Sequence, residues 1–87
     1  MKEKIFILTQ ETNNDGEITF EVFPCSTLDK SKKLLEEKKE WYQKNVVEPY
    51  KLEDDQCALA MTPTSYYNSY ENGDYYISLD IEEKEII

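Results

Sequence analysis

Apolar residues at the start of the chain follow the pattern of two β-strands joined by a turn. Ile5-Phe6-Ile7-Leu8 is apolar at consecutive positions, which is typical of a strand buried on both faces. Asn13-Asn14-Asp15-Gly16 is a turn signal, and Pro24 removes a backbone donor and should end the next strand. Between them, apolar residues alternate with polar ones at Ile18, Phe20 and Val22. We therefore expect a β-hairpin over residues 4–23.

Apolar residues with helical spacing come next. From Thr27 to Asn45 the chain has neither Gly nor Pro, and good helix formers dominate. Ser26 is expected to cap the amino end of this helix, with Asp29 as its reciprocal capping partner. One side of the helix is mostly apolar or small, at Leu28, Ser31, Leu34, Leu35, Trp41 and Tyr42. The pattern predicts one amphipathic helix over about residues 27–45.

The second half of the chain predicts a linker followed by two strands. Pro49 and a run of acidic residues favour a linker, and Pro63 should end the first of the strands. The elements expected are a linker at 46–55, a short strand at 56–62, a tyrosine-rich segment at 64–74 and a strand at 74–83. Apolar residues alternate most clearly in the last of these, at Tyr75, Ile77, Leu79 and Ile81. Within the tyrosine-rich segment, Tyr66–Glu71 is a candidate for an extra strand paired with the last one.

These elements are expected to form one domain over residues 1–87, because 87 residues are too few for two independent cores. A helix with one apolar stripe and strands with one apolar face pack most simply as two layers. We therefore predict an α+β fold in which one helix covers one face of a mostly antiparallel sheet of about four strands. The order of hairpin, helix and strands resembles that of a ubiquitin-like β-grasp. Glu85-Ile86-Ile87 lacks the diglycine through which such modifiers are conjugated, so we do not expect a conjugated modifier.

Residues that are missing from the chain exclude most enzyme classes. There is no histidine, every basic residue is a lysine, and there are only 2 glycines. The chain therefore lacks an imidazole base, the forked guanidinium contact with phosphate and the glycines of a phosphate-binding loop. Cys25 and Cys57 are expected to be small buried thiols. Glu11–Val22 fails the EF-hand pattern at its first and last positions, and the acidic run Glu53–Asp55 is expected to be solvated. We expect no catalytic, cofactor-binding or metal site.

Negative charge is concentrated in the second half of the chain. The net charge is -9, yet residues 29–45 hold more lysines than acids, and residues 46–87 hold only two lysines among many acids. Such a surface repels DNA and anionic membranes, so we expect neither direct nucleic-acid binding nor membrane binding. Four apolar residues after the charged start are too few for a signal peptide, and we expect a cytoplasmic protein.

Tyrosines gather in the same acidic half, and tyrosine is enriched at protein interfaces. We therefore expect a non-catalytic domain that binds a basic protein through a tyrosine-rich, acidic surface on the sheet face opposite the helix. The candidate partner-binding residues are Tyr66, Tyr67, Tyr70, Asp74, Tyr76, Asp80 and Glu82. One alternative is a phage or mobile-element inhibitor that imitates nucleic acid, with carboxylates in place of phosphates. Another is a structural subunit whose exposed strand edge pairs with a second copy as a homodimer.

Overall fold

A computed structural model describes residues 3–55 and 59–86 of the chain. Its elements run as a hairpin, a helix and three further strands. In order they are β1 (Glu3–Asn14), β2 (Glu17–Cys25), α1 (Leu28–Tyr42), the π-helical turn η1 (Gln43–Val47), α2 (Glu48–Tyr50), β3 (Ala60–Thr62), β4 (Ser65–Tyr70), the 3-10 turn η2 (Glu71–Gly73) and β5 (Tyr75–Ile86). This order confirms the predicted succession of a hairpin, a helix and a carboxyl-terminal group of strands.

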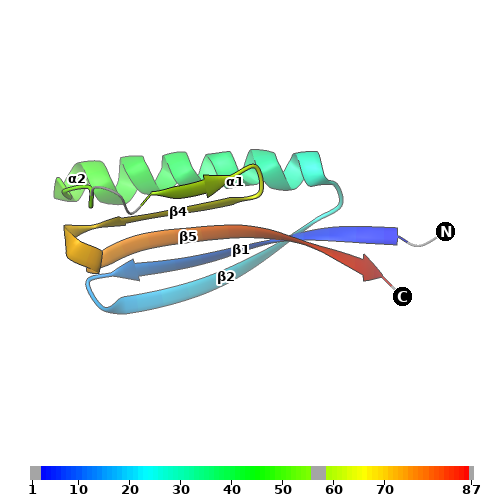
Figure 1. Cartoon of the computed structure of the whole chain (residues 1–87), viewed down its shortest axis with the longest axis horizontal. Helices are drawn as coiled ribbons and strands as arrows, with labels where there is room; N and C mark the ends of the chain where they lie inside the picture. The colour runs from blue at the N-terminus through cyan, green and yellow to red at the C-terminus, as the bar shows by residue number, and fades with distance from the viewer. Residues whose placement is uncertain (1–2, 56–58, 87) are drawn as a thin grey trace.

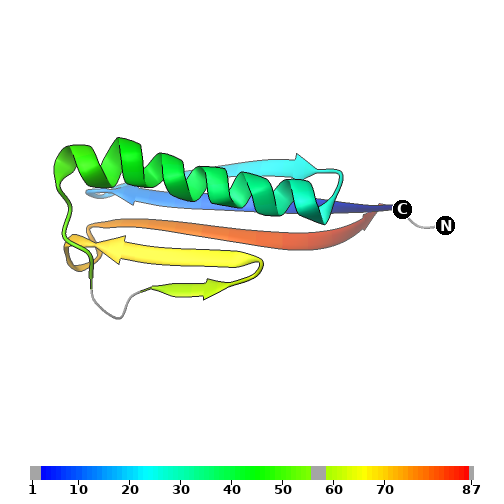
Figure 2. The ribbon, with the colours of Figure 1, turned by 90° about the horizontal axis from the view of Figure 1, so that it is seen from above.

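The strands form one antiparallel sheet, and α1 lies along one of its faces (Figures 1 and 2). The strand order is β2-β1-β5-β4-β3, so the predicted α+β fold is confirmed. The sheet has five strands where about four were expected, because the tyrosine-rich segment supplies β4, which pairs with β5. β1 and β5 run antiparallel. A β-grasp pairs its first and last strands in parallel, so the resemblance is limited to the order of elements along the chain.

The helical segment begins one residue later than predicted and continues further. Thr27 is the N-cap, since its hydroxyl accepts a hydrogen bond from the Lys30 backbone N–H at 3.1 Å. The predicted linker does not begin at residue 46, because the helix continues through Pro49 to Tyr50. Proline normally clashes with the carbonyl four residues earlier. The preceding turn widens to a π-helix, in which the Glu48 N–H donates to the Gln43 carbonyl, and this turn accommodates the proline.

Two strand boundaries also differ from the prediction. β2 does not end before Pro24 but includes it, opposite Ile7. This is possible because β2 is an edge strand, where a missing N–H leaves no ladder bond unmade. The strand expected at 56–62 is present at 60–62, and residues 56–58, including Cys57, lie outside the described residues. The last strand begins close to where it was predicted and is longer, ending at Ile86.

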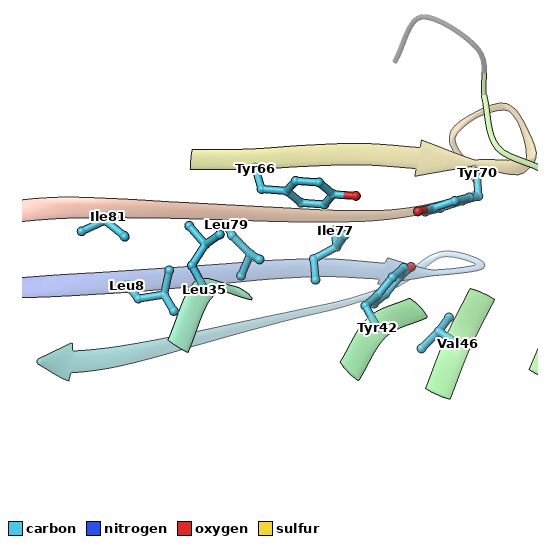
Figure 3. Packing of buried hydrophobic residues seen from close by; sticks show 9 residues of the cluster. All are labelled: Leu8, Leu35, Tyr42, Val46, Tyr66, Tyr70, Ile77, Leu79 and Ile81. Atoms are coloured by element: carbon cyan, nitrogen blue, oxygen red, sulfur yellow. The ribbon is translucent and has the colours of Figure 1, made fainter. Parts of the chain in front are cut away.

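The core lies between α1 and the central strands (Figure 3). Its buried apolar residues are Leu8, Leu35, Tyr42, Val46, Tyr66, Tyr70, Ile77, Leu79 and Ile81. Trp41 was expected in this core, but 51% of its surface is exposed. Trp41 follows Lys38 by about one helical turn, so both lie on the same flank of α1. On that flank, Lys38 Nζ lies 4.3 Å from the centre of the Phe23 ring. That flank lies at the margin of the sheet, where the helix buries less surface.

Candidate functional site

The sheet face opposite α1, which we call the open face, is not covered by any element of the described residues (Figures 1 and 2). Leu8, Gln10 and Thr12 of β1 are buried towards the helix, so the odd-numbered residues of β1 point to the open face. The register then defines rows that run across the sheet. One row contains Phe20, Glu11, Ser78 and Tyr67, and the next contains Ile18, Asn13, Tyr76 and Ser69.

Three large apolar side chains of β2 form a line along one margin of the open face. Ile18, Phe20 and Val22 are 60%, 61% and 51% exposed, and we call them the β2 apolar stripe. The two-layer prediction places the apolar faces of the strands against the helix, and for this strand that expectation is wrong. Single exposed apolar residues are common, but a continuous line of them is typical of a surface that contacts another molecule.

The hairpin turn explains why the stripe faces outwards. Asp15 and Gly16 have φ values of 55° and 94°, as in a two-residue type I′ turn, which places Asn14 opposite Glu17. From that start, Leu8 lies opposite Phe23, and the stripe lies opposite Asn13, Glu11 and Thr9. Residues directly opposite share a face. The Asp-Gly turn signal therefore contained the information needed to assign the stripe, together with these polar partners, to the open face.

A tyrosine pair and a carboxylate lie in the middle of the open face. The Tyr76 hydroxyl donates a hydrogen bond to Glu11 Oε2 at 2.5 Å, and the centres of the Tyr67 and Tyr76 rings are 5.9 Å apart. The hydrogen bond to the Glu11 carboxylate, together with burial, raises the pKa of Tyr76 above its usual value. This contact orients the Tyr76 ring and places a carboxylate directly beside Phe20.

Two more of the candidate residues belong to the same face. Asp80 lies opposite Thr9, and Glu82 lies opposite Ile7, so both carboxylates continue the β5 line begun by Tyr76. Both side chains are exposed, and Glu82 Oε2 is 3.5 Å from Lys84 Nζ. The open face thus combines an apolar margin on β2 with tyrosines and carboxylates on its central strands.

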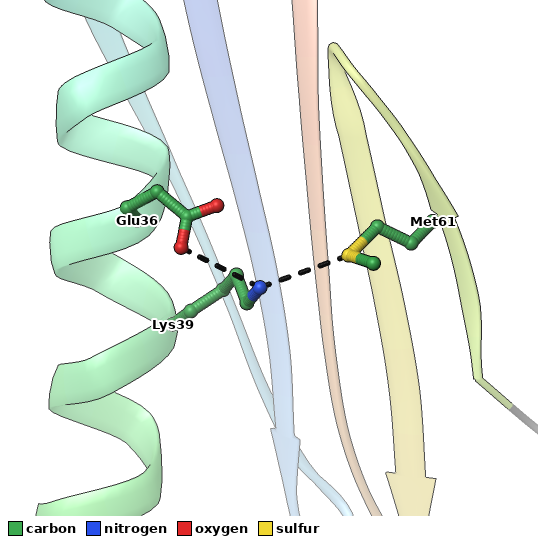
Figure 4. Close-up of polar contacts among 3 residues, drawn as sticks. All are labelled: Glu36, Lys39 and Met61. Atoms are coloured by element: carbon green, nitrogen blue, oxygen red, sulfur yellow. Dashed lines mark hydrogen bonds and ion pairs between the residues drawn. The ribbon is translucent and has the colours of Figure 1, made fainter.

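Tyr66 and Tyr70 do not belong to this surface, and the expectation that they contact a partner is wrong. They lie opposite Leu79 and Tyr75 on the helix-facing side, and are 7% and 1% exposed. Lys39 covers Tyr66, since its Nζ lies 4.6 Å from the ring centre. The same Nζ is 3.5 Å from Glu36 Oε2 and 3.7 Å from Met61 Sδ, so it links α1 to β3 (Figure 4).

The side-chain amides of Gln43 and Asn68 hold the Tyr70 hydroxyl in place. It accepts hydrogen bonds from Gln43 Nε2 at 2.6 Å and from Asn68 Nδ2 at 3.0 Å. Tyr42 packs against Tyr70, with the ring centres 6.1 Å apart. Burial raises the pKa of both phenols to about 12; Tyr70 adds to the shift of Tyr42, and Tyr66 adds to the shift of Tyr70. These tyrosines are therefore structural residues of the core.

Asp74 and the acidic run stabilise turns at one end of the sheet. The Asp74 carbonyl accepts a hydrogen bond from the Asp15 N–H at 2.9 Å, next to the hairpin turn. Asp55 accepts from the N–H groups of Asn72 and Gly73 and from the Ser69 hydroxyl. Burial opposes ionisation of Asp55, but these hydrogen bonds outweigh it and lower the pKa. Within residues 3–55 and 59–86, no group of three or more potential metal-ligating side chains occurs.

None of the helices in the described residues is long and apolar enough to span a lipid bilayer. Comparison of the chain with protein-family models, with curated protein sequences and with solved structures found no match. What the chain can bind therefore has to be read from the chemistry of the open face.

Proposed function

We propose that this protein is a small, non-catalytic domain that binds another protein through the open face of its sheet. The observation that carries the proposal is the β2 apolar stripe, whose side chains are at least half exposed on a face that no described element covers. Burying such side chains against a partner is favourable, because it removes apolar surface from water. Phe20 lies in the middle of the stripe and is the expected anchor of the interface.

The surroundings of the stripe suggest the chemistry of the partner. Glu11 lies beside Phe20, and Asp80 and Glu82 extend the negative charge along β5. An apolar surface bordered by lysine or arginine side chains complements this arrangement. The net charge of -9 would accelerate the approach of such a partner at low ionic strength. Tyr67 and Tyr76 add amphipathic contact area beside the carboxylates.

The test is to capture the partner and compare matched variants. Purified protein is immobilised, exposed to extract of the source cell, and the affinity of any recovered protein is measured by titration. Phe20→Ser should weaken binding about 5–150-fold, since burial of this ring contributes roughly 1–3 kcal/mol. Tyr50→Ser is the control, because Tyr50 is 67% exposed but lies at the end of the helix. Failure to capture any protein, or equal losses in both variants, contradicts the proposal.

The same experiment separates protein binding from imitation of nucleic acid. If carboxylates replace phosphates in a basic channel of the partner, added DNA should displace the captured partner. Binding that depends on Phe20 should instead be insensitive to DNA and respond only moderately to salt. Displacement by DNA together with full retention of binding in Phe20→Ser supports the mimic and contradicts our proposal.

A further inference from the structure

The two edges of the sheet differ in how they are protected. Residues 53–55 run beside β4, where the Asp55 N–H donates to the Ser69 carbonyl at 3.1 Å and the Glu71 N–H donates to the Glu53 carbonyl at 2.9 Å. The short strand β3 pairs with the rest of β4. At the opposite edge, β2 is nine residues long and pairs only with β1 among the described strands. A long, partly apolar open edge is a template for another strand.

The hairpin turn determines which backbone groups of β2 face outwards. In a hairpin with a two-residue type I′ loop, the residues that flank the loop exchange hydrogen bonds, and so does every second pair after them. Glu17 flanks the loop here. The backbone N–H and carbonyl groups of Ile18, Phe20 and Val22 therefore point away from β1. Pro24 is the next outward-facing position, and it has no N–H to offer.

We propose that β2 pairs with β2 of a second copy of this chain, antiparallel and around a two-fold axis at Phe20. Phe20 then lies opposite Phe20 of the second copy, and Ile18 lies opposite Val22, so all outward-facing residues of the stripe exchange backbone hydrogen bonds. Shifting the register by two residues one way places Ile18 opposite Pro24, which has no N–H to donate. Shifting it by two residues the other way places Val22 opposite Gly16, inside the turn. The register centred on Phe20 is therefore the one that uses the whole edge.

Charges on the helix side of β2 complement each other in this register. Glu17 lies opposite Phe23 of the second copy, as a pair without mutual hydrogen bonds, in which side chains approach closely. In each copy, Lys38 Nζ lies 4.3 Å from the centre of the Phe23 ring. The two-fold axis thus brings Glu17 of each copy towards Lys38 of the other. Glu21 lies opposite Thr19, so no like charges are directly opposed along the paired strands.

On the open face, pairing joins the two apolar stripes into one continuous patch around the axis. The edge contacts involve the backbone of β2, whereas the proposed partner binds its side chains. The dimer is therefore inferred independently of the proposed function. A single strand pair is a small interface, so the dimer should dissociate on dilution.

The first experiment measures mass with the purified chain alone, so its result does not depend on finding a partner. Sedimentation or light scattering across concentration should show a shift from 10.3 kDa to twice that mass. Phe20→Lys places two like charges opposite each other at the axis and should raise the dissociation constant at least tenfold. Tyr50→Lys, at an equally exposed site outside β2, should leave it unchanged. A monomer at every concentration up to about 1 mM overturns the proposal.

The second experiment tests the register with engineered cysteines, in a chain whose Cys25 and Cys57 are replaced by serine. Phe20→Cys should form an intermolecular disulfide on mild oxidation, because directly paired Cα atoms lie about 5.5 Å apart. Val22→Cys, on the same strand and face, should not, since its copies are separated by about four residues, or roughly 13 Å. Equal cross-linking of both variants overturns the register.

The third experiment tests the charge contact across the interface. Glu17→Lys and Lys38→Glu should each weaken the dimer, and the double variant should recover most of the loss, since the opposite charges again face each other. Single variants that dimerise like the wild type overturn the assigned register. A double variant as weak as the sum of both singles has the same consequence.

Discussion

Replacing Tyr70 by phenylalanine is the sharpest test of the assignment of this residue to the core. The ring of Tyr70 is 1% exposed, and Tyr70→Phe retains it while removing the acceptor for Gln43 Nε2 and Asn68 Nδ2. Asn68 keeps a second partner, Asp54 Oδ2, at 3.3 Å. Gln43 is only half-buried, so water can reach part of its amide. We therefore expect a loss of about 1–2 kcal/mol, towards the lower end of the cost of a buried donor left without a partner.

This loss is measurable without abolishing the fold. A chain of 87 residues is expected to have a free energy of unfolding of about 4–13 kcal/mol. In a domain of this size, 1–2 kcal/mol lowers Tm by about 4–16 °C. Urea titration followed by circular dichroism gives the free energy, and unchanged m-values confirm that only stability has altered.

Tyr67→Phe is the matched control, because Tyr67 lies three residues earlier on the same strand and is 36% exposed. It should change stability by less than about 0.5 kcal/mol. If Tyr70→Phe also falls within about 0.5 kcal/mol of the wild type, the amides of Gln43 and Asn68 do not depend on the phenol and the assignment is refuted.

Three further predictions concern the buried phenols, Asp55 and the helix cap. Folding raises the pKa of Tyr42 and Tyr70 from 10.0 to about 12, so the unfolded chain loses these protons at lower pH than the folded chain. The stability that the two phenols contribute should therefore be complete below pH 10 and fall as pH rises towards 12, and urea midpoints should show a shallower fall in Tyr70→Phe. The lowered pKa of Asp55 has the opposite sign: its contribution is present above about pH 3.8 and is lost as pH falls through the folded pKa, so the gap in urea midpoint between wild type and Asp55→Asn should close in acid. Thr27→Ala removes the helix cap and should cost about 0.5–2 kcal/mol in a thermal melt, whereas Ser26→Ala should be nearly neutral; equal losses would contradict the cap assignment.

The helix and the last strand were predicted well from the sequence, because the spacing of their apolar residues matches the helical or strand period. The helix-forming run after Thr27 and the alternation from Tyr75 to Ile81 each reflect burial against one neighbouring layer, and both elements are present. The continuation of the helix through Pro49 was not predicted, because it depends on a π-helical turn that has no simple sequence signal.

The candidate site was harder to predict, since alternation shows that a strand has an apolar side but not which side is covered. The stripe centred on Phe20 was assigned to the core for this reason, although the Asp15-Gly16 turn already determines its register against β1. Tyr66 and Tyr70 were misassigned for the converse reason. Asn68 lies between them on the same, buried side of β4, so neither side of this strand has an apolar pattern that would identify it as the buried one. Tyr76, Asp80 and Glu82 lie on the predicted face.

The pairing of β1 with β5 has a consequence for synthesis on the ribosome. Partners in this central pair are separated by most of the chain, from Asn14 and Tyr75 at one end to Glu3 and Ile86 at the other. A nascent chain that stops before Tyr75 carries the hairpin and the helix but lacks the strand that lies between β1 and β4. The complete sheet therefore cannot form until β5 has left the exit tunnel, and until then the β1 edge that β5 will occupy is exposed to other strands.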